Sequence, residues 1–480
     1  MGFDFLSISK KKMKTKTILS SLLGLFSLIP VAAQAASLNG SELSLAWAIP
    51  FAGILLCIAL CPLLCAHFWH HNFGKVAVGW ALACAIPLFL YNDFQAASGA
   101  MAHAMLGDYV PFIIFVGTLF IVAGGIHIRS SFAGTPIFNA AVLVVGAFMA
   151  NLMGTTGAAM LLIRPLLKAN ENRQFKMHTF IFFIFLVANI GGCLTPLGDP
   201  PLFLGFLRGV GFFWTVTHMF MPLVVATAIL VAIYLVIDTY FYKKEDMAKV
   251  HSGEKAPFKI EGGINFLFLA GVIGAVLLSG FWKSGVHFEF MHVHFSLEAL
   301  CRDAIFITIA ILSLVMTPKA AREGNQFTWD PILEVAKLFF GIFVCIVPVL
   351  EMLRAGEAGA FAPLVALVTN ADGTYNNEMF FWMTGTLSGF LDNAPTYLAF
   401  FNLAGGDPAY LMGEGATTLT AISMGAVFMG ALSYIGNAPN FMTVAIVQER
   451  GVKMPSFFGY MIWSVALLLP TFYICTKIFL

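Results

Sequence analysis

The chain has 480 residues, of which 59% are hydrophobic and only 11% are charged, and its mean hydropathy is +0.86. A soluble protein cannot cover its surface with so few polar residues, so this composition indicates a polytopic membrane protein. The formal net charge of +1 gives no basis for nucleic-acid binding. Long continuous apolar runs exclude the alternating pattern of a membrane β-barrel, so the lipid bilayer is expected to surround an all-α fold.

Residues 1–36 are predicted to be an N-terminal extension with a signal peptide. The basic stretch from Met13 precedes an apolar run, Ile18–Ala33, and Ala33-Gln34-Ala35 has the small-x-small pattern of a cleavage site. These are the three parts of a removable secretory signal. Without cleavage, the apolar run would become an additional membrane span.

Three apolar stretches follow, at about 45–66, 74–91 and 110–128. Basic residues mark the cytoplasmic ends of membrane spans. Lys75 and Arg129 therefore place their ends inside, and Asp93 lies at an outer loop.

The next apolar run, 136–168, has Gly154-Thr155-Thr156-Gly157 at its middle and basic flanks at both ends, among them Arg129, Lys168 and Arg173. This run is too short for two spans of ~20 residues each and too long for one. A re-entrant hairpin with its tip near Thr155–Thr156 fits this length and these flanks. A tilted helix followed by an amphipathic segment is the alternative.

Residues 177–212 are predicted to form a discontinuous helix, broken at Asn189-Ile-Gly-Gly192 and at Thr195–Pro201. A returning span completes a first repeat, 45–240. The Lys-rich stretch 241–262 is then expected to be a cytoplasmic linker.

The second repeat, 263–476, is expected to follow the same plan. Three spans lead to a second hairpin at 379–404, which is broken at Asp392–Thr396 and lacks basic residues at both ends. A discontinuous helix at 416–450 and a final span complete a fold of about 10–12 transmembrane segments.

The two halves carry matching breaks. Gly198-Asp199-x-Pro201 recurs in the second half as Gly436-Asn437-x-Pro439, and the same offset in sequence places Gly154–Gly157 over Asp392–Pro395. The basic flanks orient the two hairpins from opposite faces of the membrane, which predicts an inverted-topology repeat.

Backbone groups exposed at such breaks must line a cavity inside the protein, because lipid cannot satisfy them. The carboxylates Asp199 and Asp392 cost ~2.5–3.5 kcal/mol each at membrane depth, which favours a functional role. Asp199 followed by Pro200 also has the sequence of a helix N-cap. The side chains at the four breaks form an oxygen-rich set that suits a hard cation: Thr155, Thr156, Asn189, Thr195, Asp199, Asp392, Asn393, Thr396, Asn437 and Asn440.

Neighbouring carboxylates that are partly desolvated hold protons firmly, because the charged form is disfavoured. Such a site can exchange H⁺ for a metal cation. Arg164, ten residues beyond the first tip, is either a counter-charge or a cytoplasmic topology signal.

The order of hairpin and broken helix, with Asn189–Asp199 in one half and Leu391–Pro395 plus Gly436–Pro439 in the other, resembles the ion transporter superfamily. The chain is most similar to its NhaD-type sodium/proton antiporters and to the related citrate-transporter branch. The resemblance implies a scaffold domain, a transport domain that moves like an elevator, a homodimer, and ion binding by the ten residues named above. The dicarboxylate carriers of the superfamily have Ser-Asn-Thr at both tips, and this chain does not.

The function expected is a secondary antiporter of Na⁺ or Li⁺ against H⁺, multi-pass in a bacterial-type inner membrane. It is expected not to be an enzyme, and to have no cofactor other than the transported ions and no transition-metal site. A citrate, dicarboxylate or other anion symporter is the alternative. An intramembrane aspartyl protease using Asp199 and Asp392 is a remote one, because Pro196-Leu-Gly-Asp199 is not the expected Gly-x-Gly-Asp.

Overall fold

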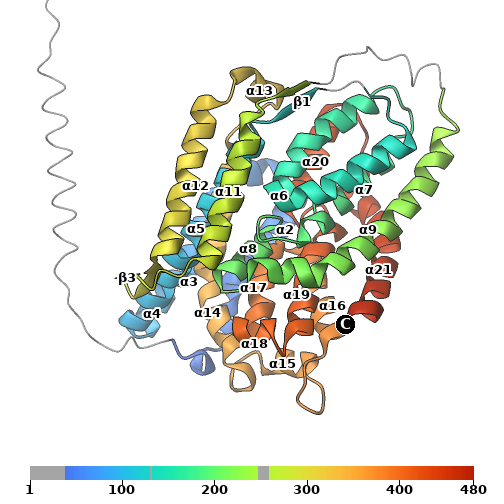
Figure 1. Cartoon of the computed structure of the whole chain (residues 1–480). Helices are drawn as coiled ribbons and strands as arrows, with labels where there is room; N and C mark the ends of the chain where they lie inside the picture. Colours follow the sequence, from blue (N-terminus) through green and yellow to red (C-terminus); the bar gives the residue numbers. More distant parts are fainter. Residues whose placement is uncertain (1–37, 130–131, 247–258) are drawn as a thin grey trace, which may run out of the picture. The chain divides into compact units, whose positions relative to one another are not determined.

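The computed structural model describes residues 38–129, 132–246 and 259–480 (Figure 1). The predicted signal peptide and most of the predicted linker lie outside the described residues. Nine helices in the described part are long and apolar enough to cross a membrane, and two shorter apolar helices accompany them. The prediction of an all-α polytopic membrane protein is therefore confirmed.

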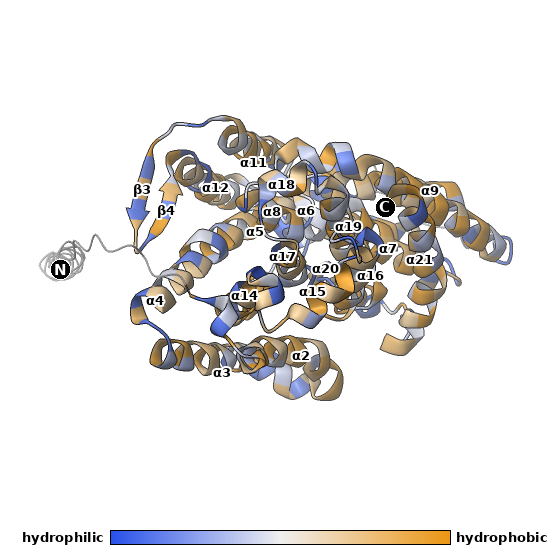
Figure 2. Cartoon of the chain, turned by 90° about the horizontal axis from the view of Figure 1, so that it is seen from below, coloured by the Kyte–Doolittle hydropathy of each residue, from blue (hydrophilic) through white to orange (hydrophobic). Residues whose placement is uncertain are grey.

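The outer helices consist largely of apolar residues, as the hydropathy colouring of Figure 2 shows. Leu64, Leu90, Val236, Val315 and Ile462 each have more than 70% of their surface exposed. Exposed apolar surface on this scale is unfavourable in water, whereas lipid tails accommodate it.

The first half has six parts in chain order: two helices, a third helix, a hairpin, a broken helix and a returning helix. Their bounds are α2 Ile49–Leu64, α3 Ala66–Tyr91, α4 Phe94–Ala102 continuing through a π-helical turn at His103–Tyr109 into α5 Val110–Ala123, α6 Pro136–Ala169, α7 Met177–Leu186 with a 3₁₀ turn at Ile190–Cys193 and α8 Pro200–Leu207, and α9 Phe212–Tyr242.

The second half repeats this order. Its parts are α11 Ile264–Phe281, α12 Leu297–Met316, α13 Lys319–Gly324, α14 Asp330–Arg354, α15 Ala362–Val368, α16 Asn377–Phe390 with α17 Asn393–Leu403, α18 Pro408–Met412, α19 Ala416–Met429 with a 3₁₀ turn at Gly430–Leu432 and α20 Ala438–Glu449, and α21 Phe457–Phe479. Two antiparallel strand pairs complete the described part, β1 His127–Arg129 with β2 Lys259–Glu261, and β3 His287–Phe290 with β4 Val293–Ser296.

The α6 segment folds back on itself at Gly154. This glycine has φ +78° and ψ 154°, so it interrupts the helix one residue before the predicted tip. A straight helix of 34 residues would separate its ends by about 51 Å. Instead, the backbone N–H of Gly134 donates to the carbonyl oxygen of Ala169 at 2.8 Å, so the two ends meet.

The second hairpin is formed by α16 and α17, which pack against each other. Its tip contains Asp392, whose side chain accepts from the backbone N–H of Ala394 at 3.0 Å and caps α17. The two tips therefore turn by different means: a glycine in the left-handed region in the first half, and an aspartate N-cap in the second.

The two hairpins open toward opposite ends of α9, a helix of 31 residues and about 46 Å. Near its start, Trp214 donates to the carbonyl oxygen of Met412, just beyond the second hairpin. Near its end, Asp238 accepts hydrogen bonds from Asn139 and Arg173, at the open end of the first hairpin. Which end of α9 faces the cytoplasm stays a prediction.

The two broken helices are built alike. The Thr195 hydroxyl donates to the Asn151 carbonyl oxygen, and at the equivalent position of the second half the Ser433 hydroxyl donates to that of Gly389. Asp199 (φ −146°, ψ 144°) and Asn437 (φ −152°, ψ 141°) begin α8 and α20 with the same backbone conformation. The sequence repeat is thus a repeat in three dimensions.

Each half completes the other. The third helix of the second half, α14, packs on α2 and α3, and its counterpart α5 packs on α11 and α12. The same exchange occurs in the other group of helices, where α8 packs on α17 and α20 packs on α6. We refer to α2–α5 with α11–α14 as the scaffold group, and to α6–α9 with α16–α21 as the hairpin group.

Candidate functional site

Asp199 lies at the centre of the hairpin group with 1% of its surface exposed. It occupies the N-cap position of α8, but its side chain makes no capping hydrogen bond. Asp199 therefore has the N-cap position that its sequence predicts, but the prediction of a capping hydrogen bond was wrong. Pro200 and Pro201 offer no N–H groups, so the carboxylate bonds elsewhere.

Three side chains from three other breaks donate to this carboxylate. The Thr155 hydroxyl lies 2.8 Å from Oδ1, the Asn437 amide lies 3.1 Å from the same oxygen, and the Asn393 amide donates to Oδ2. All three are buried. Two of these residues come from the second half, so the acid of one repeat is held jointly by both.

A second group of polar contacts closes the chain around this centre. The Asn189 amide donates to Asn440 Oδ1 at 2.7 Å, and Asn440 in turn donates to the carbonyl oxygens of Gly430 and Ser433. Asn440 thereby satisfies backbone groups that the break in the second helix leaves without helical partners.

Two buried side-chain carbonyl oxygens at this centre, Asn189 Oδ1 and Asn393 Oδ1, receive no hydrogen bond from the residues that the structure describes. Both amides lie near the same glycine, since a Cβ placed on Gly430 would be 2.9 Å from Asn189 Oδ1 and 3.7 Å from Asn393 Nδ2. Because buried acceptors are normally paired, oxygens left open beside a carboxylate form a set of ligands for a hard cation.

The other predicted site residues do not touch Asp199 through hydrogen bonds in the described part of the chain. Asp392 is half-buried and caps α17, Thr396 donates to the backbone oxygen of Asp392 at 2.9 Å, and Thr195 donates to the Asn151 carbonyl at 2.6 Å. Thr156 is half-buried and makes no side-chain hydrogen bond among the described residues. The structure thus gathers Thr155, Asp199, Asn393 and Asn437 into one side-chain network, and Asn189 and Asn440 belong to the second group of contacts.

Comparison with known proteins places the chain in a family. A family model described as "Putative citrate transport" matches residues 40–480. The chain belongs to this family. It is also 23% identical over 360 residues to an uncharacterized transporter of Mycobacterium bovis and to one of Mycobacterium tuberculosis, covering 72% of this chain and 78% of each relative. The protein is a transporter and not an enzyme.

Sequence reasoning missed one residue that shapes the centre of this citrate-transport family member. Asn151 is buried in the first arm of the hairpin, where its Oδ1 accepts from the backbone N–H of Leu194 at 2.7 Å and its own carbonyl accepts from Thr195. It therefore joins the hairpin to the broken helix. The spacing of 44 residues from Asn151 to Thr195 equals that from Thr155 to Asp199, which was the available signal.

A second buried network was also missed, at the open end of the first hairpin. Asp238 and Arg173 form a bidentate ion pair with distances of 2.6 and 3.1 Å, and both side chains are inaccessible. His178 and Tyr234 bond the same carboxylate at 2.7 and 2.9 Å. Arg173 was interpreted only as one of several basic flanking residues, because sequence alone does not show which flanking charges are buried.

Proposed function

We propose that this transporter exchanges Na⁺ (or Li⁺) for H⁺ across a bacterial-type inner membrane, and that Asp199 binds both ions in turn by alternating access. The observation that carries the proposal is a buried carboxylate that has only uncharged donors and lies beside two unpartnered carbonyl oxygens. None of the ion pairs among the described residues includes Asp199. An uncompensated buried charge is unfavourable, so a cation or a proton is the species that completes this centre.

The amide of Asn393 allows the centre to hold either ion. When Asp199 is ionised, Asn393 Oδ1 is free to bind a cation together with the carboxylate and Asn189 Oδ1. When Asp199 is protonated, the Asn393 amide can rotate by half a turn so that Oδ1 accepts the new O–H. The two ions then compete for the same oxygens, as coupled exchange requires.

Asp392 has a supporting role in this proposal. It lies next to Asn393 in sequence and lies at the tip of the second hairpin, within electrostatic reach of Asp199. A second negative charge close to the centre attracts cations and disfavours anions.

A carboxylate symporter is the second candidate, favoured by the family description and by Arg164. Arg164 lies in the second arm of the first hairpin and has two buried nitrogen atoms, Nε and Nη1, without partners. Guanidinium groups bind carboxylates with two parallel hydrogen bonds. Arg164 does not contact Asp199, and the open atoms beside Asp199 are acceptors, which repel a carboxylate.

The test uses purified protein in proteoliposomes that contain a trapped pH dye. Pulses of Na⁺, Li⁺, K⁺ and citrate are added outside, and labelled citrate uptake is measured in parallel. Antiport predicts a pH change with Na⁺ or Li⁺ and none with K⁺ or citrate. Citrate uptake that disappears in Arg164→Gln, without a Na⁺-dependent pH change in the wild type, would replace antiport by symport.

A further inference from the structure

Two phenylalanines at equivalent positions of the repeat have opposite environments. Phe203 of α8 is fully buried, and its equivalent in the second half, Phe441 of α20, has 48% of its surface exposed. The Phe203 ring stacks on Phe115 of α5 with a centroid distance of 3.7 Å, and the Arg302 guanidinium lies 5.8 Å from its centroid. The first half therefore docks its broken helix on the scaffold group through Phe203, whereas Phe441 stacks on no aromatic ring of the described residues.

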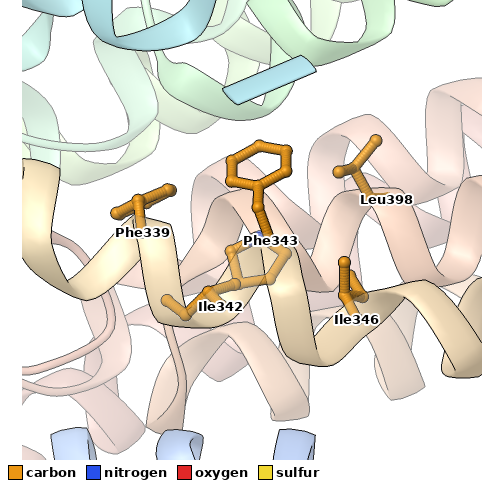
Figure 3. Close-up of a pocket in the computed structure, with 6 residues that line it drawn as sticks. Phe339, Ile342, Phe343, Ile346 and Leu398 are labelled. Carbon is orange, nitrogen blue, oxygen red and sulfur yellow. The ribbon is translucent and has the colours of Figure 1, made fainter. Parts of the chain in front are cut away.

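The scaffold group contains a second copy of the docking residue. Ile114-Phe115-Val116 of α5 recurs as Ile342-Phe343-Val344 in α14, the equivalent helix of the other half. Phe343 lines an apolar recess together with Phe339, Ile342 and Ile346 of the same helix (Figure 3). Pro395 and Leu398 of the second hairpin also line this recess. A ring at the position corresponding to Phe115 is thus present and is not stacked on Phe441.

The hairpin arms show that the mismatch is a displacement along the scaffold group. Met160 and Leu398 are equivalent by the same offset that relates Phe203 to Phe441. Leu398 lies beside Phe343, but Met160 clusters with Phe120, five residues beyond Phe115. Five residues of helix correspond to about 7.5 Å. In a symmetric arrangement, Met160 and Leu398 would contact equivalent positions of α5 and α14. Instead, both contacts are shifted in one direction, toward the C-terminal end of α5 and the N-terminal end of α14.

The polar contacts that join the hairpin group to the scaffold group also differ between the two halves of the repeat. Arg208, at the end of α8, donates to Asp108 of the π-helical turn at 2.5 Å, and Arg354 at the end of α14 donates to Asn402 at 2.7 Å. Arg164 is equivalent to Asn402 in the repeat. Its one contact with the scaffold group among the described residues is with Gln326, at 3.4 Å.

We propose that the structure is one end state of the transport cycle, and that in the other end state Phe441 stacks on Phe343 while Phe203 leaves Phe115 and Arg208 separates from Asp108. The proposal rests on the transport function and does not depend on which ion is carried. Because the two halves have the same local structure, exchanging their environments gives a second arrangement of similar packing without a new fold. The partly buried ion pair of Arg208 and Asp108 then stabilises the observed state.

The experiment places the photoreactive residue p-benzoylphenylalanine at position 441 in the full chain in native membranes. After illumination, the residue to which position 441 has become attached is located by mass spectrometry. The control has p-benzoylphenylalanine at position 458, because Phe458 is also exposed but lies at the start of α21. We expect adducts between position 441 and α14 near Phe343, and no adducts between position 458 and α14. Adducts of position 441 with lipid or its present neighbours only, in membranes that still transport, would overturn the proposal.

A second variant tests the ion pair. Asp108→Asn in the same background removes the charge that Arg208 contacts, and we expect at least about a fivefold higher yield of the adduct between position 441 and α14. An unchanged yield would contradict the role given to this ion pair. Adducts in a protein that shows no Na⁺/H⁺ exchange would overturn the proposed ion and leave the exchange of Phe203 and Phe441 standing.

Discussion

Replacing Asp199 by Asn should abolish cation exchange and leave the protein folded. The fold is expected to survive because the new amide oxygen can still accept from Thr155 and Asn437, and the new NH₂ group can donate to the open Oδ1 of Asn393. Loss of a charge-assisted bond costs about 1–2 kcal/mol. Removal of a buried charge offsets that cost.

The effect on cation binding is much larger. A cation in contact with a carboxylate oxygen, at about 2.4 Å, gains about 7 kcal/mol at an effective dielectric constant of about 20. If half of this is lost to reorganisation, the remaining ~3.5 kcal/mol corresponds to roughly 300-fold in affinity. Asp199→Asn should therefore show no Na⁺-dependent dealkalisation of everted vesicles at Na⁺ concentrations that saturate the wild type.

The double variant Asp199→Asn with Asn437→Asp sharpens this test. Asn437 Nδ2 and Asp199 Oδ1 are 3.1 Å apart, so the exchange keeps one acid and one amide in contact. Recovery should be partial, because a carboxylate at position 437 would face the carbonyl oxygen of Ala188, to which the Asn437 amide now donates. Asp372→Asn, in an exposed turn, is the control for loss of one acid. Wild-type exchange by Asp199→Asn would refute the role given to this carboxylate.

Three further outcomes follow from the same contacts. Thr155→Val removes the hydroxyl that donates to Asp199 and should raise the Na⁺ concentration for half-maximal exchange about 5–10-fold, whereas Thr156→Val should leave it unchanged. Gly198→Ala should abolish the yield of folded protein in detergent, because its Cβ would overlap the Gly192 carbonyl oxygen. Gly154→Ala meets no atom closer than 3.5 Å and should lose only the ~1–3 kcal/mol that a side chain costs at its positive φ and extended ψ. Asp238→Ala removes the bidentate partner of the buried Arg173, which keeps only the Glu245 carboxylate at 3.7 Å, and should destabilise the protein by about 1.5–3 kcal/mol, seen as a lower melting temperature in detergent.

The sequence was sufficient for the fold class and for the position of the breaks. Lipid forces backbone polar groups to bond internally, so apolar length and Gly/Pro interruptions have few structural solutions in a membrane. The repeat offset, read from Gly198 and Gly436, recurs in the structure as equivalent hydrogen bonds and equivalent dihedral angles at Asp199 and Asn437. The first tip lies at Gly154, one residue before the predicted position.

The sequence was not sufficient for the roles of neighbouring polar residues. Asp392 and Asn393 are adjacent at a helix start, and a difference of one residue decides which caps α17 and which reaches Asp199. Helix phase at a break is set by tertiary packing, which no local pattern determines. The buried pair of Arg173 and Asp238 was equally hidden, because its partners are 65 residues apart and each alone is an ordinary residue at the end of a span.

The contact between Asp199 and Asn437 explains why an inverted repeat carries its acid only once at this position. Equivalent residues near the pseudo-twofold axis approach each other, and these two lie 3.1 Å apart. Two aspartates at that distance could not both be ionised and would have to share a proton. With one Asn, the partner becomes a donor, and the remaining carboxylate can alternate between a proton and a cation. Asn437, in place of a second aspartate, is therefore a condition for the exchange of a proton and a cation at Asp199. The double variant Asp199→Asn with Asn437→Asp tests this condition directly.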